Sequence, residues 1–533
     1  MLHRRSFLGG LPLLAAGGPA TFRILDKATG RETAARIRLV DAQGAEAVPL
    51  GHAESLEEGA REGDVRIQSR RFAYVDGRFT LDPRRLPLKY QVVKGYEYLM
   101  AEGELRAQGP FDIPLTRWSE LSRKGWQSGD IHIHHIAPKT CRLEMEAEDL
   151  NVANILTSDF TLDQDRFEGQ ASAHSGSRRL IYVTQEFRND QLGHLCLLNL
   201  KRLIEPVKPM RHEHYPLLLD VCDQTRRQGG YVSWAHFPSW PGAEGPLDVA
   251  LEKVDGLEIL SQLDPREFPI YMRNLVPELA ANNGLRLWYR YLNCGFRLTA
   301  TAGTDKMTTF VTAGANRVFA RVDGEFTCQA WIDALRAGRT FVTNSPLLKF
   351  TVNGREAGTT LSLDSKKHKA LEIHARAESQ LPYDRLEILV NGETVAEAAP
   401  GGSRHRAEIR LTHPLRSSCW VAARASEDPR RYKSRGVDFT KVHSASGTSL
   451  SDCYGTRRPE VAFAHSSPVY VLRDGRPIRS WDDADYYVRY LDNTIRWLET
   501  QAKFARPADR EASIEAFRRG RAVFLQRAQE GGL

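Results

Sequence analysis

Short apolar runs alternate with stretches of helical periodicity between residues 125 and 344, and this rhythm constrains the fold more than any other feature of the chain. Apolar runs such as 152–156 have the length of buried strands, whereas residues 143–153 and 216–228 contain helical spacing. Strands that alternate with helices are typical of β/α units, which place parallel strands in one sheet. We therefore expect an α/β fold with a barrel over residues 119–345.

Strand-like alternation on both sides of this region predicts two β-sandwiches. At 35–39 Ala, Ile and Leu alternate with Arg, so we interpret residues 21–118 as an N-terminal β-sandwich. Alternation returns after the barrel, where Asn353-Gly354 and Asn391-Gly392 have the residue pair preferred in two-residue hairpin turns. A second β-sandwich is therefore expected over residues 346–430.

Residues 431–533 are expected to contain a long loop followed by helices. The segment 433–458 is rich in Ser, Gly and charged residues and has little periodicity, so it predicts no core element. The tail has helical spacing, with one apolar face formed by Tyr487, Leu491, Ile495 and Leu498.

The N-terminus has the features of an export signal. Arg4 and Arg5 precede an apolar run at 8–16, and small residues follow to position 20. This order resembles a twin-arginine signal over residues 1–20, and the alternative is a short disordered basic start. The run is too short for a membrane-spanning helix. We expect export to the periplasm or the exterior through the twin-arginine machinery, and no membrane span.

Charge and cysteine content exclude other classes of protein. A formal net charge of +7 is small for 533 residues, and Lys and Arg are scattered, so nucleic-acid binding is not indicated. Seven cysteines include no C-x-x-C pair, so neither a zinc ribbon nor a disulfide framework is predicted.

The strongest chemical signal is a strand with two histidines on one face. Asp130, His132 and His134 alternate with Ile131 and Ile133, so the three polar side chains point the same way. Two imidazoles at the end of a strand can bind one ion. Asp130 is placed to accept a ring N–H as an outer partner of a metal-binding histidine.

Further ligand-type residues end separate apolar runs. Asp159, Glu186, His236 and Asp305 each follow such a run. A parallel barrel brings the C-terminal ends of its strands to one mouth, where its active sites lie, so these residues are expected to converge. Any one of the acids alone is more often a helix cap.

Seven motifs extend over nearly the whole chain after the signal, namely WQSGDIHIH (126–134), AEDLNVA (147–153), GHL (193–195), AHFP (235–238), AGTD (302–305), GRTFVTN (338–344) and SSPVYV (466–471). Together they resemble the CehA/McbA-type metallohydrolases of the PHP (polymerase and histidinol phosphatase) superfamily.

This resemblance implies a distorted (β/α)7 barrel that binds one to three divalent ions, Zn, Mn or Fe, in a family with members that hydrolyse the aryl carbamate carbaryl. Two positions depart from the superfamily pattern, because Asp305 is followed by Lys306-Met307 and a second-strand Asp-His pair is replaced by Ser158-Asp159-Phe160. Whether Asp159 is a ligand, and whether a third metal position is occupied, stay open. The matching ligand positions are His132, His134, Glu186, His194, His236 and Asp305.

The sequence also suggests a specific role for several individual residues. Glu186 is the best bridging ligand, because a carboxylate offers two oxygens to two ions. Glu258 ends another apolar run, where it orients a ligand or binds substrate, and the alternative is a helix cap or a buried salt bridge. Lys306 and Arg317 are candidates for stabilising negative charge at the mouth, with a solvated basic residue as the alternative. His212 and His214 are interpreted as loop histidines.

These residues favour a metal-dependent hydrolase of a small-molecule ester or carbamate-like bond. Metal-activated hydroxide would attack the carbonyl, and Asp305, Glu186 and Lys306 are the expected catalytic residues. No Gly-x-Ser-x-Gly motif is present, so a serine nucleophile is not indicated. A PHP-type phosphoesterase is the alternative enzyme, and an exported glycan- or protein-binding scaffold with a degenerate metal site is the alternative of another class. The sequence leaves the oligomeric state open.

Overall fold

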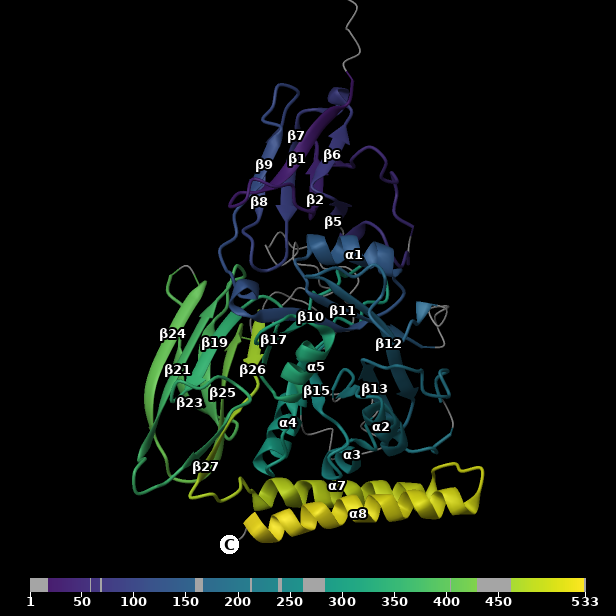
Figure 1. Cartoon of the computed structure of the whole chain (residues 1–533), viewed down its shortest axis with the longest axis vertical. Coiled ribbons are helices and arrows are strands. Elements are labelled where there is room, and N and C mark those ends of the chain that lie inside the picture. The colour runs from purple at the N-terminus through teal and green to yellow at the C-terminus, as the bar shows by residue number, and fades with distance from the viewer. Residues whose placement is uncertain are drawn as a thin grey trace, which may run out of the picture.

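The computed structural model is mixed α/β, and strands make up most of its regular structure (Figure 1). It describes residues 18–57, 59–67, 70–158, 166–210, 213–237, 242–261, 283–402, 404–428 and 462–531. The twin-arginine motif, Asp159, His212 and the segment 433–458 lie outside these residues. No helix in the described part of the chain is long and apolar enough to cross a membrane.

Two sheets pack around one core in the N-terminal part of the chain. One sheet has the order β6-β1-β9, and the other has the order β4-β5-β2-β7-β8 with β3 beside β2. Phe22 and Ile24 from the first sheet share a core with Ile37 and Val92 from the second. We call this body the N-terminal sheet pair. Its strands are β1 (Ala20–Asp26), β2 (Ala35–Val40), β3 (Glu46–Ala47), β4 (Val65–Ile67), β5 (Arg70–Val75), β6 (Arg78–Leu81), β7 (Leu88–Val93), β8 (Ala101–Leu105) and β9 (Asp112–Leu115).

A curled sheet occupies the centre of the molecule. Its described strands follow the order β16-β15-β14-β13-β12-β11-β10-β17-β18. The sheet bends back on itself, because Ile133 at the end of β10 pairs in parallel with Lys306, just after β16. The strands are β10 (Trp126–Ile133), β11 (Val152–Thr157), β12 (Leu180–Asn189), β13 (Gly193–Leu198), β14 (Tyr231–Trp234), β15 (Gly256–Leu260), β16 (Thr299–Ala302), β17 (Arg317–Arg321) and β18 (Thr340–Thr343).

Helices connect only some of these strands, so the β/α rhythm is less regular than the sequence indicates. The strands β12 and β13 are joined by a tight connection and pair in antiparallel fashion, with Glu186 opposite Cys196. The predicted helix at 143–153 is also shorter, because the helix ends at Ala147 and β11 begins at Val152. The helices of this region are α1 (Pro138–Ala147), α2 (Leu218–Arg227), α3 (Gly245–Ala250), α4 (Gly284–Asn293) and α5 (Cys328–Arg336).

The curled sheet continues into a second two-sheet body. Beyond β18 the sheet proceeds through β26, β25, β22 and β23, with β27 and β20 attached, and a separate sheet β19-β21-β24 packs on it. Strands β26 and β27 lie C-terminal of the boundary expected at residue 430. The strands are β19 (Leu347–Val352), β20 (Thr360–Leu363), β21 (Ala370–Glu378), β22 (Arg385–Val390), β23 (Glu393–Ala398), β24 (Arg406–Pro414), β25 (Cys419–Ser426), β26 (Phe463–Ser466) and β27 (Val469–Arg473).

The predicted hairpin at Asn391-Gly392 is confirmed, whereas the turn at Asn353-Gly354 closes an isolated bridge between Val352 and Arg355, because β19 pairs with β21 and β20 with β27. Asn391 and Gly392 join β22 to β23 with φ angles of 51° and 90°, and Asn353 and Gly354 have φ angles of 49° and 74°. Two successive positive φ values define the type I′ turn, which Asn-Gly adopts with little strain.

Two long helices close the chain beneath α3 and α4 (Figure 1). These are α7 (Trp481–Thr500) and α8 (Pro507–Gly531), and the predicted apolar face of α7 is confirmed, since its four residues are all buried. A side chain at Gly520 would lie 2.8 Å from Leu247 of α3, so glycine permits the close approach of α8.

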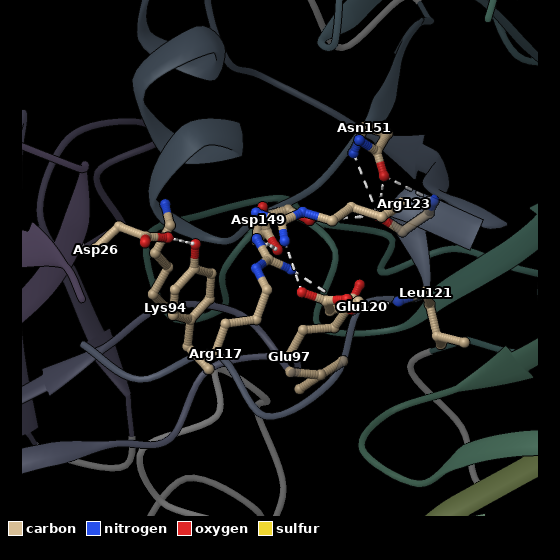
Figure 2. A network of polar contacts seen from close by, with 12 residues as sticks. Asp26, Lys94, Glu97, Arg117, Glu120, Leu121, Arg123, Asp149 and Asn151 are labelled. Carbon is tan, nitrogen blue, oxygen red and sulfur yellow. Dashed lines mark hydrogen bonds and ion pairs between the residues drawn. The ribbon is translucent and has the colours of Figure 1, made fainter. Parts of the chain in front are cut away.

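An ion-pair network explains why the helix stops at Ala147 and ties it to the N-terminal sheet pair. Asp149 has a left-handed φ of 51°, which an α-helix does not allow. Its carboxylate accepts hydrogen bonds from Arg117 at 2.8 Å and Arg179 at 2.9 Å. Figure 2 shows Arg117 between Asp149 and Glu97, and its Nη1 lies 3.5 Å from Glu97. The turn between α1 and β11 is therefore held by two arginines, Arg117 and Arg179, which come from different parts of the chain.

Arg117→Met should destabilise the protein by about 3 kcal/mol, because it removes the guanidinium that lies between two largely buried carboxylates and leaves Asp149 paired with Arg179 and Glu97 with the main-chain N–H of Leu121. Urea denaturation followed by tryptophan fluorescence measures the change. The matched control is Arg84→Ala, which removes a surface guanidinium paired with Asp82 in the same body and should leave the midpoint unchanged. Equal midpoints for both variants would contradict this role of Arg117.

Candidate metal centre

The histidine strand β10 delivers two imidazoles to the interior of the curled sheet. His132 and His134 are buried, while Ile131 and Ile133 pack into apolar clusters on the other face. The ring centroids of the two histidines are 5.0 Å apart, and their Nε2 atoms approach to 3.0 Å. The predicted sharing of one face is confirmed.

The outer nitrogens of both rings have acceptor partners. His134 Nδ1 lies 2.7 Å from the carbonyl oxygen of Leu156, and His132 Nδ1 lies 3.1 Å from Glu258 Oε2. Both oxygens can accept a hydrogen from Nδ1, which leaves Nε2 as the nitrogen of each ring that faces the interior of the cluster. The two Nε2 atoms, 3.0 Å apart, are close enough to share a proton or to bind one metal ion.

Two carboxylates converge on the same nitrogen atoms. Asp305 Oδ1 lies 3.5 Å from His132 Nε2 and 3.6 Å from His134 Nε2. Glu186 Oε2 lies 3.3 Å from His134 Nε2. Ligand atoms about 2.1 Å from one ion are separated by roughly 3.0–3.4 Å from each other. The spacing thus fits a metal ion with modest adjustment.

Glu186 also faces a second pair of histidines. Its Oε1 lies 3.1 Å from His194 Nδ1 and 3.5 Å from His236 Nε2, whose rings are 5.1 Å apart. One oxygen of Glu186 therefore points toward His134 and the other toward His194 and His236. A carboxylate shared in this way can bridge two ions.

The local electrostatics favour positive charge at the centre. Burial raises the pKa of Glu186, but its hydrogen bonds with His132, His134, His194 and His236 hold that pKa well below the ordinary value. Burial likewise raises the pKa of Asp305, and the neighbouring histidines lower it overall. Burial lowers the pKa of His132, yet Cys196, Glu258 and Asp305 raise it well above its usual value. The cluster therefore attracts a cation, either protons or a metal ion.

The segments that carry His236 and Asp305 have a strained backbone. Their φ angles are 33° and 49°, in the left-handed region that side chains rarely adopt. Glu258 holds one segment, because its carboxylate accepts the main-chain N–H of His236. A Cβ at Gly303 would lie 2.3 Å from Glu258 and 2.4 Å from the His132 Cβ, so glycine lets the Asp305 segment approach β10.

Asp130 and Glu258 support the centre in different ways. Asp130 accepts main-chain N–H groups from His132 at 2.9 Å, Thr304 at 3.0 Å and Gly314 at 2.8 Å, and burial raises its pKa to about 6. It thereby joins β10 to the segment after β16. The expectation that Asp130 accepts a ring N–H is therefore corrected, because the carboxylate that faces a ring nitrogen of His132 is Glu258.

Lys306 and Arg317, the two basic candidates, point into the segment that follows Asp305. Lys306 Nζ donates to the carbonyl oxygens of Val311 at 2.7 Å and Thr308 at 3.1 Å, and it lies 3.4 Å from Glu144. Arg317 Nε donates to Gly314 O at 2.6 Å. Both side chains are buried, which differs from the expectation of cations at the mouth. Sequence spacing does not determine where a long side chain ends, and here both stabilise the segment after Asp305.

Sequence reasoning missed Cys196. Its Sγ lies 3.4 Å from His132 Nδ1, and with His132 and Glu258 it forms one of the groups able to hold a metal ion. The signal was its position two residues after His194, which places both side chains on one strand face. The other groups in the described residues are His132-Glu186-His236 and His132-His134-Asp305.

The other histidines that the sequence analysis considered lie in different places. His194, a ligand position implied by the family resemblance, lies in the cluster, with its Nδ1 3.1 Å from Glu186. His214 packs its ring against Trp497 at 4.9 Å, and its Nδ1 accepts the main-chain N–H of Lys503 at 2.8 Å, so it joins the C-terminal helices. Asp159 and His212 lie outside the described residues.

Comparisons with models of protein families, with curated proteins and with solved structures found no match to this chain.

Proposed function

We propose that this chain is a metal-dependent hydrolase that cleaves an ester or carbamate-like bond in a small molecule. The observation that carries the proposal is the approach of His132 Nε2 and His134 Nε2 to 3.0 Å, with both opposite nitrogens facing acceptors. With Nδ1 of each ring facing an acceptor, the two Nε2 atoms are the nitrogens left to bind a metal ion or to share a proton.

His132, His134 and Asp305 would hold one divalent ion, and His194 and His236 would hold a second, with Glu186 between them. Zn, Mn or Fe suit this mixture of imidazole and carboxylate ligands. When bound, such ions lower the pKa of water toward neutrality and polarise a carbonyl group.

The protein's own residues position and deprotonate the reactants. Asp305 is the proposed proton acceptor, because its side chain is 10% exposed, more than the other carboxylate of the cluster. Glu186 is 2% exposed and serves to hold the two halves of the cluster together. Glu258 keeps the His132 ring oriented through Nδ1.

We also propose that the curled sheet is a distorted seven-stranded barrel of the PHP type, flanked by two β-sandwiches, and that the chain belongs to the CehA/McbA-type metallohydrolases. The parallel pairing of Ile133 with Lys306 supports closure, because it brings the segment after β16 beside β10. The motif resemblance supports the family.

The first test is metal content. The double variant His132→Ala/His134→Ala should lose most of the bound divalent metal, because it removes two of the proposed ligands. Elemental analysis of the purified full chain measures it, and circular dichroism checks that the sheets remain folded. His374→Ala is the matched control, since His374 lies on β21 and pairs with Glu408. Unchanged metal in the double variant would rule out this site.

The second test is substrate class. With Mn²⁺ or Zn²⁺ supplied, an aryl ester or an aryl carbamate should be hydrolysed with a higher kcat/KM than an aryl phosphate with the same leaving group. The reason is that Lys306 and Arg317, the nearby candidate cations, are turned into loops, so less charge is offered to a phosphate dianion. A phosphate turned over more than about tenfold faster, roughly 1.4 kcal/mol, would favour a phosphoesterase. No turnover with any of the three would favour a binding scaffold.

The third test is export through a twin-arginine signal, which we propose from the first residues of the chain. Replacing Arg4 and Arg5 together by Lys should trap the precursor inside the cell, because the receptor recognises the arginine pair. Cell fractionation measures the distribution. Normal export of the double-lysine form would contradict a twin-arginine route, and Arg31→Lys provides the control at an exposed arginine outside the motif.

A further inference from the structure

A crevice with a volume of about 390 Å³ lies where three parts of the molecule meet. One wall is α4, another is the turn between β22 and β23 together with β25, and the third is the first turn of α7. In Figure 1, α4 lies directly above α7 at this junction. Small-molecule sites commonly have volumes of roughly 300–1,000 Å³ and lie between domains, so this crevice has the size and the location of a ligand site.

The walls of the crevice are joined to one another by hydrogen bonds. Asn293 of α4 donates from Nδ2 to Asp483 Oδ2 at 2.9 Å and to Asn391 O at 3.3 Å. Its Oδ1 accepts the indole N–H of Trp420 at 2.7 Å, and Asn391 Oδ1 accepts the main-chain N–H of Trp420 at 3.0 Å. Since these bonds connect all three parts, the walls are ordered before a ligand binds, which lowers the entropic cost of binding.

Most charged side chains that line the crevice are neutralised by partners of opposite charge. Arg290 Nη1 donates to Asp483 Oδ1 at 2.5 Å. Arg424 donates from Nε and from Nη2 to the two oxygens of Glu387, at 2.8 Å each. These two arginines are therefore held in place by carboxylates and add little net charge to the crevice.

Arg286 and Glu393 are the two other charged residues of the crevice. Both side chains are exposed, and neither has a hydrogen bond or an ion pair with another of the described residues. One is positive and the other negative, so the lining has no large excess of either charge. An anion would be attracted by one of these groups and repelled by the other, which favours a neutral ligand.

The crevice offers both hydrogen-bond donors and hydrogen-bond acceptors. Arg286 is a donor and Glu393 an acceptor, and Nε of Arg290 has no hydrogen-bond partner within the described ranges. A hydroxyl group can donate and accept at the same time, so neighbouring hydroxyl groups suit such a wall. The larger apolar side chains of the lining are Leu285 and Tyr289, and both are buried, so little apolar surface faces a ligand.

We propose that this crevice binds a neutral saccharide, and that Arg286, Arg290 and Glu393 contact its hydroxyl groups. A saccharide carries many hydroxyl groups on a rigid ring, so it can use the donors and the acceptors together and loses little conformational freedom on binding. An apolar molecule would displace water from the charged wall without replacing its hydrogen bonds. The inference is independent of the proposed hydrolase function, because no lining residue of the crevice belongs to the histidine cluster.

An array of immobilised neutral and acidic saccharides, probed with the fluorescently labelled full chain, tests this proposal. We expect the protein to bind one or more of the neutral saccharides. Calorimetry with the strongest of these in its free form then gives the dissociation constant. Arg286→Ala and Glu393→Ala should each raise that constant by about tenfold, because each removes a charge-assisted hydrogen bond to the ligand.

Two matched controls lie on the same sandwich outside the crevice. Arg410→Ala removes an arginine whose side chain is 74% exposed, and Glu397→Ala removes an exposed carboxylate on β23, the strand that carries Glu393. Both should bind the saccharide as the unaltered protein does. The double variant His132→Ala/His134→Ala should also keep its affinity, and circular dichroism checks that every variant is folded.

Three results would overturn the saccharide site. The first is that the unaltered protein binds no saccharide on the array, or acidic saccharides alone. The second is a dissociation constant that is unchanged in both Arg286→Ala and Glu393→Ala. The third is loss of binding in the folded His132→Ala/His134→Ala variant, because the saccharide would then occupy the histidine cluster. Failure of the hydrolase assays alone would leave the saccharide site standing.

Discussion

The placement of Glu186 among four histidines is the interaction on which the rest of the central structure depends. A carboxylate that is 2% exposed is unfavourable unless positive charge or hydrogen-bond donors surround it. Glu186 lies on β12, and its partners come from three other strands or strand ends, namely β10, β13 and the end of β14. Only a sheet that curls can bring those segments within 4 Å of one side chain. The cluster can therefore form only if the sheet is curved.

The features around the cluster maintain that curvature. Asp130 binds main-chain N–H groups on both sides of the closing contact, and Gly303 removes the side chain that would separate β16 from β10. Glu258 holds the strained backbone at His236 while it orients the His132 ring. Because each of these groups contacts the backbone of one strand and a ligand or backbone of another, loss of one would alter both the shape of the sheet and the spacing of the ligands.

Residues of this cluster could be predicted from the sequence, but the pairing of the strands that carry them could not. Strand alternation places His132 and His134 on one face because that periodicity depends only on local geometry. It cannot reveal that β12 and β13 form an antiparallel hairpin, since pairing direction depends on partners distant in the sheet, and this hairpin is what brings His194 and Cys196 beside Glu186. The direction of the Lys306 side chain was equally inaccessible, because it depends on carbonyl groups in a folded loop. Strands β26 and β27 were missed as part of a sheet because they follow a segment without periodicity.

The contacts of the N-terminal sheet pair are concentrated on the segments that flank the cluster. Arg36 pairs with Glu148 and Arg117 with Asp149 at the C-terminal end of α1, and Glu62 binds Ala137 at its N-terminal end. Thr309, after Asp305, is bonded by Ala60 and Arg66. The N-terminal sheet pair is therefore joined to α1 by ion pairs at the C-terminal end of the helix and by a hydrogen bond to a carboxylate at its N-terminal end. Such charged contacts are directional, so they fix the orientation of the loop 59–64 as well as its attachment. The hydrogen bond of Ala60 with Thr309 places the same loop against the segment that follows Asp305.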